Sequence, residues 1–267
     1  MPVCRVCRRE EAHLSYEHVP PRSAFNDEPA TVYGLQDWLE RQQRGGLRGG
    51  RVQRRGAGGH VLCERCNNLT GSWYAGELAR AARAGARILL ETPLQEFDEL
   101  TEYRWAQVRI LRTETTPHPL RLIKQIITMI LATSPPELTQ NEPELGDFVL
   151  DRDRTGLSNR FHFYLALFAG PHARSTGVVG AMDFDRGRQF TLVEVAFPPF
   201  AYVMTIDSDP DPIRSVDITE LTTIGYGQRA DLELDLLIGF GHTAWPIDYR
   251  TRAMIEQERA LADSHLP

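Results

Sequence analysis

The chain lacks several features that define large classes of proteins. Its 267 residues contain no run of about 18 apolar residues, the minimum for a membrane-spanning helix. The first residues, MPVCRVCRREE, include no apolar segment of the kind found in a secretory signal. Cysteine is scarce, with 4 in the whole chain. We therefore expect a cytoplasmic protein with reduced thiols and no role in a membrane.

Lysine is absent from the first 85 residues, so their positive charge comes from arginine alone. This part has 13 arginines against 9 acidic residues, whereas the remainder has 17 basic against 27 acidic residues. The basic part is therefore the candidate for a polyanionic partner, although two ordinary solvated surfaces explain the charges equally well. The length and the 42% hydrophobic content are sufficient for two folded domains, and we place them at residues 1–92 and 93–267.

The cysteines form two C-x-x-C pairs, Cys4 with Cys7 and Cys63 with Cys66. In a chain with reduced thiols, this number and spacing are typical of a tetrahedral zinc site. Redox chemistry is the competing interpretation, but it does not explain a second pair. We expect the four thiolates to hold a structural Zn²⁺ ion.

The residues after the first pair predict a strand that carries two polar side chains. Residues 13–16 favour an extended strand that continues into Glu17 and His18 and ends at Pro20, because proline cannot donate to a sheet. Apolar residues at helical spacing predict a short amphipathic helix over residues 31–43. The segment 44–59 is rich in glycine and arginine and is expected to be a mobile loop without a core.

The second cysteine pair is followed at once by Asn67 and then by a segment rich in alanine, leucine and arginine. This composition predicts a helix from Ala75 to Glu91, which would present Asn67 near a helix start. The remainder is expected to be an α+β domain with a mainly antiparallel sheet. Helices are predicted at 120–133 and 249–262, and strands at 104–111, 161–168, 177–183, 189–196, 202–206 and 232–237.

Three polar residues suit the hydrolysis of a phosphodiester bond. A histidine such as His18 can deprotonate water near neutral pH. The oxygens of Glu17 and Asn67 are the ligands that Mg²⁺ or Mn²⁺ prefers. The ordinary alternatives are a surface histidine at position 18 and a helix cap at position 67.

The order C-x-x-C, EHVPP, C-x-x-C-N-N resembles that of the HNH endonucleases. The resemblance covers residues 1–85 and implies a ββα-metal, treble-clef fold. It assigns Glu17 and Asn67 to a catalytic metal and His18 to the activation of water, with the four cysteines holding structural zinc. The family often has an asparagine before the second cysteine pair, where this chain has Gly58, and His60 is the nearest candidate to replace it.

The sequence thus predicts a metal-dependent endonuclease acting on a nucleic acid, with DNA the expected substrate and bacterial defence or restriction a context extrapolated from the resemblance. A zinc-stabilised binding module without catalysis is the alternative. A homodimer or a partner protein could engage residues 93–267. Four arginines are candidates for contact with phosphates: Arg22, Arg51, Arg54 and Arg55.

Overall fold

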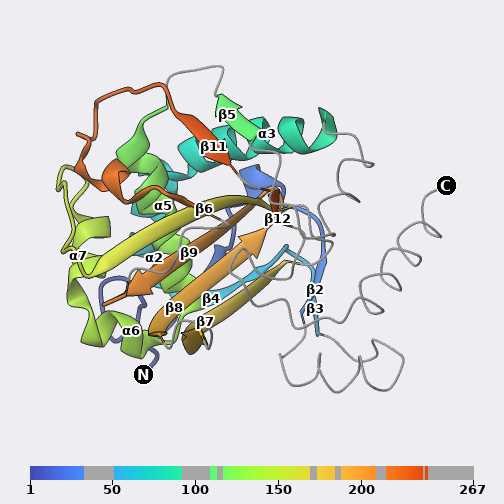
Figure 1. Ribbon diagram of the computed structural model, residues 1–267. Coiled ribbons are helices and arrows are strands. Elements are labelled where there is room, and N and C mark those ends of the chain that lie inside the picture. The colour runs from blue at the N-terminus through green and yellow to red at the C-terminus, as the bar shows by residue number, and fades with distance from the viewer. Residues whose placement is uncertain are drawn as a thin grey trace.

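A computed structural model describes residues 1–32, 51–91, 109–112, 117–168, 173–183, 188–208, 215–236 and 238–239 (Figure 1). The fold is a mixed α+β architecture with helices and an antiparallel sheet, as the sequence predicts. Its helices are η1 (Arg22–Ala24), α2 (Glu64–Trp73), α3 (Ala75–Glu91), α5 (Pro119–Thr133), α6 (Pro136–Asn141), α7 (Pro143–Leu150) and η2 (Thr219–Thr223). Its strands are β1 (Ser15–His18), β2 (Ala30–Val32), β3 (Arg51–Gln53), β4 (Gly58–Leu62), β5 (Arg109–Arg112), β6 (Phe161–Phe168), β7 (Arg174–Asp183), β8 (Arg188–Phe197), β9 (Phe200–Ile206), β10 (Val216–Asp217), β11 (Glu233–Leu236) and β12 (Ile238–Gly239).

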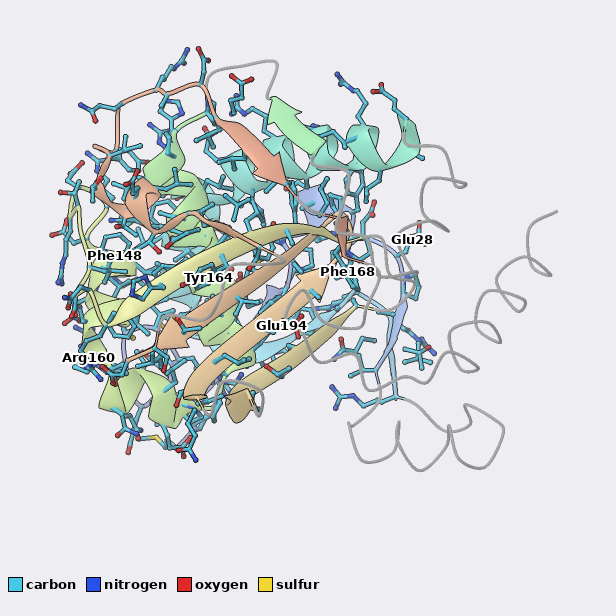
Figure 2. All side chains as sticks on the ribbon, in the orientation of Figure 1. Glu28, Phe148, Arg160, Tyr164, Phe168 and Glu194 are labelled. Carbon is cyan, nitrogen blue, oxygen red and sulfur yellow. The ribbon has the colours of Figure 1, made fainter. Side chains whose placement is uncertain are left out.

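The main sheet has the strand order β10-β6-β9-β8-β7, and all of these neighbours are antiparallel. The short β12 adds a parallel pairing to β6. Alternation along β6 sends Phe161 and Phe163 into the main core and Tyr164 and Phe168 to the opposite face. Figure 2 labels Tyr164 and Phe168 on that opposite face, together with the buried Glu194 of β8.

Helix α5 lies against the core face of this sheet and is buried on almost every side. It begins with a proline at its first position and ends at Ser134, just before two further prolines that cannot continue a helix. Its Lys124 is the only lysine of the chain. The Lys124 ammonium donates to the carbonyl oxygens of Asp151 and Arg152 at the end of α7, and burial lowers its pKa to about 8.

The sheet and α5 thus bear out the strands predicted over 161–168, 177–183, 189–196 and 202–206 and the helix over 120–133. The predicted helix Ala75–Glu91 is α3, and β11 matches the predicted strand at 232–237. Of the strand predicted at 104–111, only residues from 109 on are described, and the helix predicted at 249–262 lies outside the described residues.

The predicted loop 44–59 is wrong where it is described, because it contributes strands. Residues 51–53 are β3, and Gly58 and Gly59 begin β4, which pairs with β1. Glycine is unfavourable in an isolated strand, but here the partner strand requires it: a Cβ added at Gly58 would lie 2.1 Å from the carbonyl oxygen of Glu17. The predicted helix over 31–43 is also wrong at its start, since Thr31 and Val32 belong to β2.

One hydrophobic core connects the cysteine-containing segments with the sheet. Its buried members include Cys4, Leu62 and Tyr74 as well as Ile126 and Phe163. None of the described helices is long and apolar enough to cross a membrane. The domain boundary at residue 92 stays a prediction, and residues 92–108 lie outside the described part of the chain.

Polar contacts join the first cysteine segment to the helices behind the sheet. Arg5 donates to the carbonyl oxygen of Ala132 at 2.6 Å, and Arg8 forms an ion pair with Asp147 at 2.7 Å. A Cβ added at Gly146 would lie 2.3 Å from the carbonyl oxygen of Val6. The turn that carries Cys4 and Cys7 is therefore held by contacts with α5, α6 and α7 as well as by contacts within the N-terminal segment.

Candidate functional site

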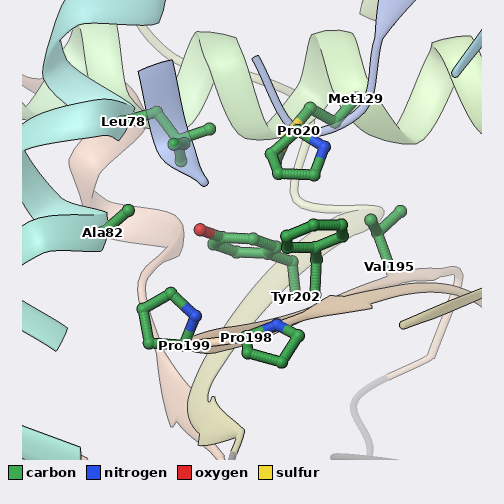
Figure 3. Close-up of a pocket in the computed structure, with 10 residues that line it drawn as sticks. Pro20, Leu78, Ala82, Met129, Val195, Pro198, Pro199 and Tyr202 are labelled. Atoms are coloured by element: carbon green, nitrogen blue, oxygen red, sulfur yellow. The ribbon is translucent and has the colours of Figure 1, made fainter. Parts of the chain in front are cut away.

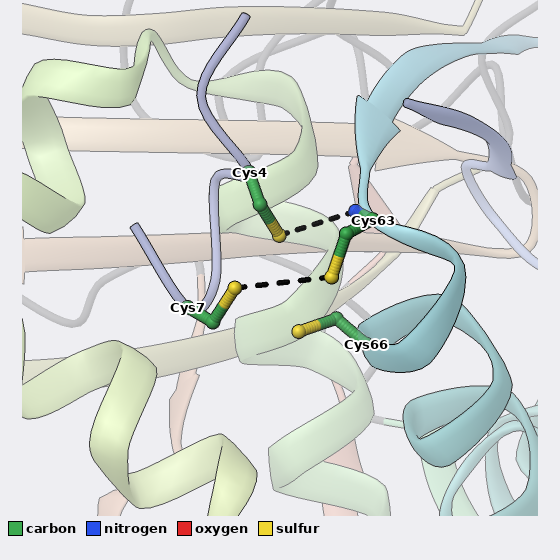
Figure 4. A group of neighbouring side chains, drawn as sticks. All are labelled: Cys4, Cys7, Cys63 and Cys66. Atoms are coloured by element: carbon green, nitrogen blue, oxygen red, sulfur yellow. Dashed lines mark hydrogen bonds between the residues drawn. The ribbon is translucent and has the colours of Figure 1, made fainter. Parts of the chain in front are cut away.

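The four cysteine thiols converge on one point (Figure 4). Cys4 and Cys7 come from the N-terminal turn, Cys63 precedes α2, and Cys66 lies in the first turn of α2. Their sulfur atoms all lie within 4.8 Å of one another, and the Cys7 and Cys63 sulfurs are 3.8 Å apart. A tetrahedral Zn²⁺ with Zn–S bonds of about 2.3 Å separates its sulfurs by about 3.8 Å. This cluster can bind a metal such as zinc.

Within the cluster, Cys4 is favoured as a thiolate, the form that binds metal, whereas burial raises the pKa of Cys7. The Cys66 thiol and backbone N–H groups donate to the Cys4 sulfur and lower the pKa of Cys4, while burial acts in the opposite direction. One of these donors is the N–H of Cys63, at 3.2 Å from that sulfur. The pKa of Cys66 is raised in turn, because it donates to Cys4. Backbone N–H groups therefore point at the Cys4 sulfur, where the negative charge of a thiolate would lie.

Glu17 and His18 lie side by side at the end of β1, but on opposite faces of the hairpin. In the β1–β4 register Glu17 pairs with Gly59 and His18 pairs with Gly58. Alternation puts Glu17 on the same face as Ser15, and Ser15 accepts a hydrogen bond from Asn67 of α2. The Glu17 side chain is therefore on the face covered by α2, whereas His18 is on the face shared with Tyr16.

The Glu17 carboxyl group is buried, with 6% of the residue exposed. It has no hydrogen-bond or ion-pair partner among the residues that the structure describes. Burial therefore raises its pKa to about 7. An unpartnered buried carboxylate is costly, and a divalent cation is the kind of group that would compensate for it.

His18 is held by one ring nitrogen, and the other has no hydrogen-bond partner among the residues that the structure describes. Its Nε2 lies 2.9 Å from the carbonyl oxygen of Arg55. Because a carbonyl can only accept, Nε2 carries the proton, and a neutral ring then has its lone pair on Nδ1. Burial lowers the pKa of His18, and the positive charges of Arg22 and Arg55 act in the same direction. The imidazole is thus kept in the neutral form that can accept a proton.

Asn67 ties α2 to β1 through its amide nitrogen. Nδ2 donates to the carbonyl oxygen of Tyr16 at 2.9 Å and to the hydroxyl oxygen of Ser15 at 3.0 Å. Both amide hydrogens are thereby used, while Oδ1 has no partner within the described part of the chain. Asn67 therefore combines a structural bond with one free oxygen on the face of β1 that also carries Glu17.

Asn26 is a site residue that the sequence reasoning missed. It is 2% exposed, and its Nδ2 donates to the carbonyl oxygens of Pro20 and Ala57 at 2.6 and 2.8 Å. Its Oδ1 accepts the N–H of Ala57 at 2.7 Å. Gly56, with φ +91°, completes the turn, because a Cβ there would lie 2.4 Å from the Asn26 carbonyl oxygen. Asn26 thus fixes the loop before β4.

His60 lies on the same face of the hairpin as Tyr16 and His18. Its Nδ1 is 2.9 Å from the carbonyl oxygen of Leu14, and its ring meets the Tyr16 ring edge to face with centroids 5.3 Å apart. The Tyr16 hydroxyl donates to the carbonyl oxygen of Gly56 at 2.7 Å. His60 therefore secures the start of the hairpin, and its place as a substitute for the asparagine stays a prediction.

Three of the four candidate arginines act electrostatically on residues of this face. Arg51 and Arg55 both act on Tyr16, where their charges oppose the rise in pKa that burial causes. Arg22 and Arg55 act on His18. None of the four makes an ion pair with any residue that the structure describes. Unpaired guanidinium groups beside a neutral imidazole suit an anionic ligand.

A small apolar pocket lies behind the site segment (Figure 3). Pro20 and Ala24 contribute from the segment after β1, and Figure 3 shows Tyr202 of the sheet between Pro20 and Pro199. Its other lining residues are Leu78, Ala82, Met129, Val195, Phe197 and Pro198. The pocket offers no titratable side chain suited to phosphodiester chemistry and serves as packing between the site segment and the sheet.

Comparison of the chain with protein-family models, with curated proteins and with solved structures gave no match. Functional inference for this chain therefore depends on the geometry of these residues.

Proposed function

We propose that the chain is a metal-dependent endonuclease of the HNH type, which hydrolyses phosphodiester bonds in DNA. The observation that carries the proposal is the β1–β4–α2 arrangement. Glu17 lies on the face of β1 that α2 and Asn67 cover, His18 follows it on the opposite face, and four clustered thiols lie next to the hairpin. These segments are about fifty residues apart in sequence, so a ββα-metal fold accounts for a juxtaposition that neither segment explains by itself.

His18 is the general base in this proposal. Its Nδ1 accepts a proton from water, the water oxygen attacks the phosphorus, and the bond from phosphorus to the leaving 3′-oxygen breaks. The Arg55 carbonyl fixes the ring orientation through Nε2. Unpaired arginines on the same face hold the phosphate in place.

The donor set near α2 fits a Mg²⁺ or Mn²⁺ ion, since the buried Glu17 carboxyl group and the Asn67 Oδ1 are oxygen ligands without other partners in the described chain. Such an ion would supply neutralisation of the charge that gathers on the phosphate. Zn²⁺ on Cys4, Cys7, Cys63 and Cys66 has a structural role in the proposal. A role in bacterial defence or restriction is an extension of it.

One observation favours a second candidate, a zinc-stabilised module that binds a nucleic acid or a protein without cleaving it. Asn67 already uses its amide group to join α2 to β1, which is a sufficient structural reason for its presence. In this case His18 would contribute only to the surface.

Plasmid nicking in Mg²⁺ or Mn²⁺ separates the two candidates. We expect His18→Ala to lose cleavage by about 10²- to 10⁴-fold, because a positioned base contributes that much. His13→Ala is the matched control, since His13 is exposed and precedes the same strand. Equal cleavage by wild type and His18→Ala, or no cleavage by wild type in either metal, would rule out the enzyme.

A further inference from the structure

Strands β2 and β3 form a separate antiparallel ribbon. They pair with each other and with no other strand in the described part of the chain. The side chains of Thr31, Val32, Arg51 and Val52 are all exposed, and Val32 and Val52 are among the most exposed large apolar residues described. A short two-stranded ribbon with most of its side chains exposed gains little from burial, which leaves its exposed side chains open to a partner.

The ribbon presents one face toward the candidate site. Val32 is directly opposite Arg51, and Ala30 is opposite Gln53, so these four side chains share a face. Gln53 donates to the Gly58 carbonyl oxygen at 2.9 Å and accepts the Gly58 N–H at 3.1 Å, which docks the base of the ribbon on the β1–β4 hairpin. Val32 and Arg51 therefore extend the face that carries Tyr16 and His18.

The charge of β3 and of the turn that leads from it to β4 is positive. Four exposed arginines make no ion pair with the described residues: Arg22, Arg51, Arg54 and Arg55. Glu28, labelled in Figure 2, precedes β2 and forms no ion pair with these arginines. A short, positively charged ribbon with exposed valines has the chemistry expected of an element that binds in a DNA groove.

We propose that the β2–β3 ribbon enters the major groove of double-stranded DNA, with Val32 and Arg51 turned to the base edges and Arg54 and Arg55 on the phosphates. A major groove about 12 Å wide admits a two-stranded ribbon whose strands are about 4.8 Å apart, whereas a minor groove about 6 Å wide does not. Arginine reads guanine there, and an apolar side chain contacts the thymine methyl group. This inference rests on the proposed function only for its choice of DNA.

Fluorescence anisotropy with a DNA duplex two helical turns long tests the ribbon without cleavage, with Ca²⁺ replacing Mg²⁺. We expect Arg51→Gln to weaken duplex binding about tenfold, and Arg9→Gln, which removes an equal charge from the exposed N-terminal turn, to change it less than twofold. Tighter binding of the DNA duplex than of the same sequence as single-stranded DNA or as an RNA duplex supports the proposal, because the major groove of RNA is too deep and narrow. Equal effects of the two substitutions, or equal binding of all three probes, would overturn it.

Dimethyl sulfate footprinting then identifies the groove. Protection of guanine N7 by wild type, lost in Arg51→Gln, is expected for the major groove, and protection of adenine N3 alone would contradict the proposal. Failure of this inference is distinguishable from failure of the nuclease. Duplex binding that depends on Arg51, without any cleavage, supports the ribbon proposal and contradicts the nuclease. Cleavage that Arg51→Gln does not affect supports the nuclease and contradicts the ribbon proposal.

Discussion

At the scale of single residues, the Glu17 carboxyl group makes stability depend on pH. Its pKa rises from 4.5 to about 7 on folding. Between these values the folded chain holds a proton that the unfolded chain has released, so stability falls as the pH increases through this window. Without divalent cations, urea unfolding should show wild type losing about 2.5 kcal/mol relative to Glu17→Gln between pH 5 and pH 8.

The matched control for this measurement is Glu28→Gln, since Glu28 is exposed. This variant should follow wild type across the same pH range. Addition of Mg²⁺ or Mn²⁺ at pH 8 should restore the stability of wild type and leave Glu17→Gln unchanged, if the carboxylate binds the ion. A pH dependence that is identical in wild type and Glu17→Gln would contradict the assignment.

Asn26 provides a second residue-scale prediction. Asn26→Ala removes three hydrogen bonds and leaves the Pro20 carbonyl oxygen and the Ala57 N–H without the side-chain partner that they have here, while the Ala57 carbonyl keeps its bond from the Val19 N–H. We expect a loss of about 3 kcal/mol in the free energy of unfolding, measured by urea denaturation. The exposed Asn68→Ala should change it by less than about 0.5 kcal/mol. Wild-type stability in Asn26→Ala would show that the loop before β4 is held by other contacts.

At the scale of elements, α3 packs closely on the turn between β8 and β9. A Cβ added at Gly85 would lie 2.6 Å from Cζ of Phe200 and 3.0 Å from Cγ of Pro199, whereas one added at Gly76 of the same helix meets nothing within 4 Å. Thermal unfolding should therefore show Gly85→Ala destabilised by about 1–3 kcal/mol. Gly76→Ala should be neutral or more stable by up to about 1 kcal/mol. Similar effects at both positions would mean that α3 can shift away from the sheet.

Elements with a strong pattern of their own could be predicted from the sequence. The apolar run of α5 and the alternating strands β6 to β9 each contain enough pattern to define the element. Strands β3 and β4 could not be predicted in this way, because Gly58 and Gly59 are extended only through pairing with β1, a contact distant in sequence. Helices α6 and α7 were not predicted, although each has a proline and then a glutamate at its start.

The same distinction applies to the candidate site. The cysteine cluster could be predicted because two fixed spacings define it, and the structure brings the four thiols together. The loop contacts of Asn26 could not, since no spacing relates Asn26 to Ala57, 31 residues away. The assignment of Glu17, His18 and Asn67 to catalysis stays a prediction.

At the scale of the whole molecule, the thiol cluster joins the N-terminal turn to α2 within the main core. Removal of zinc by a chelator should therefore unfold the main sheet as well as the cysteine-containing segments, since Cys4 and Phe163 belong to one hydrophobic core. Zinc release measured with a colorimetric dye and the loss of far-ultraviolet circular dichroism should follow a single transition. Loss of zinc with an unchanged dichroism signal would indicate that the helices and sheet fold independently of the cluster.

The contacts of the Cys4–Cys7 turn with α5, α6 and α7 limit which segments of this chain could be transferred to another protein. Arg5 and Arg8 hold backbone and side-chain groups more than one hundred residues further along the sequence, and Tyr74 donates to the carbonyl oxygen of Val149 at 2.8 Å. A gene fusion that transferred only the N-terminal segments would expose apolar side chains that are buried here and would leave hydrogen-bond donors without acceptors. We therefore expect that recombination can transfer these segments only together with the helices that they contact.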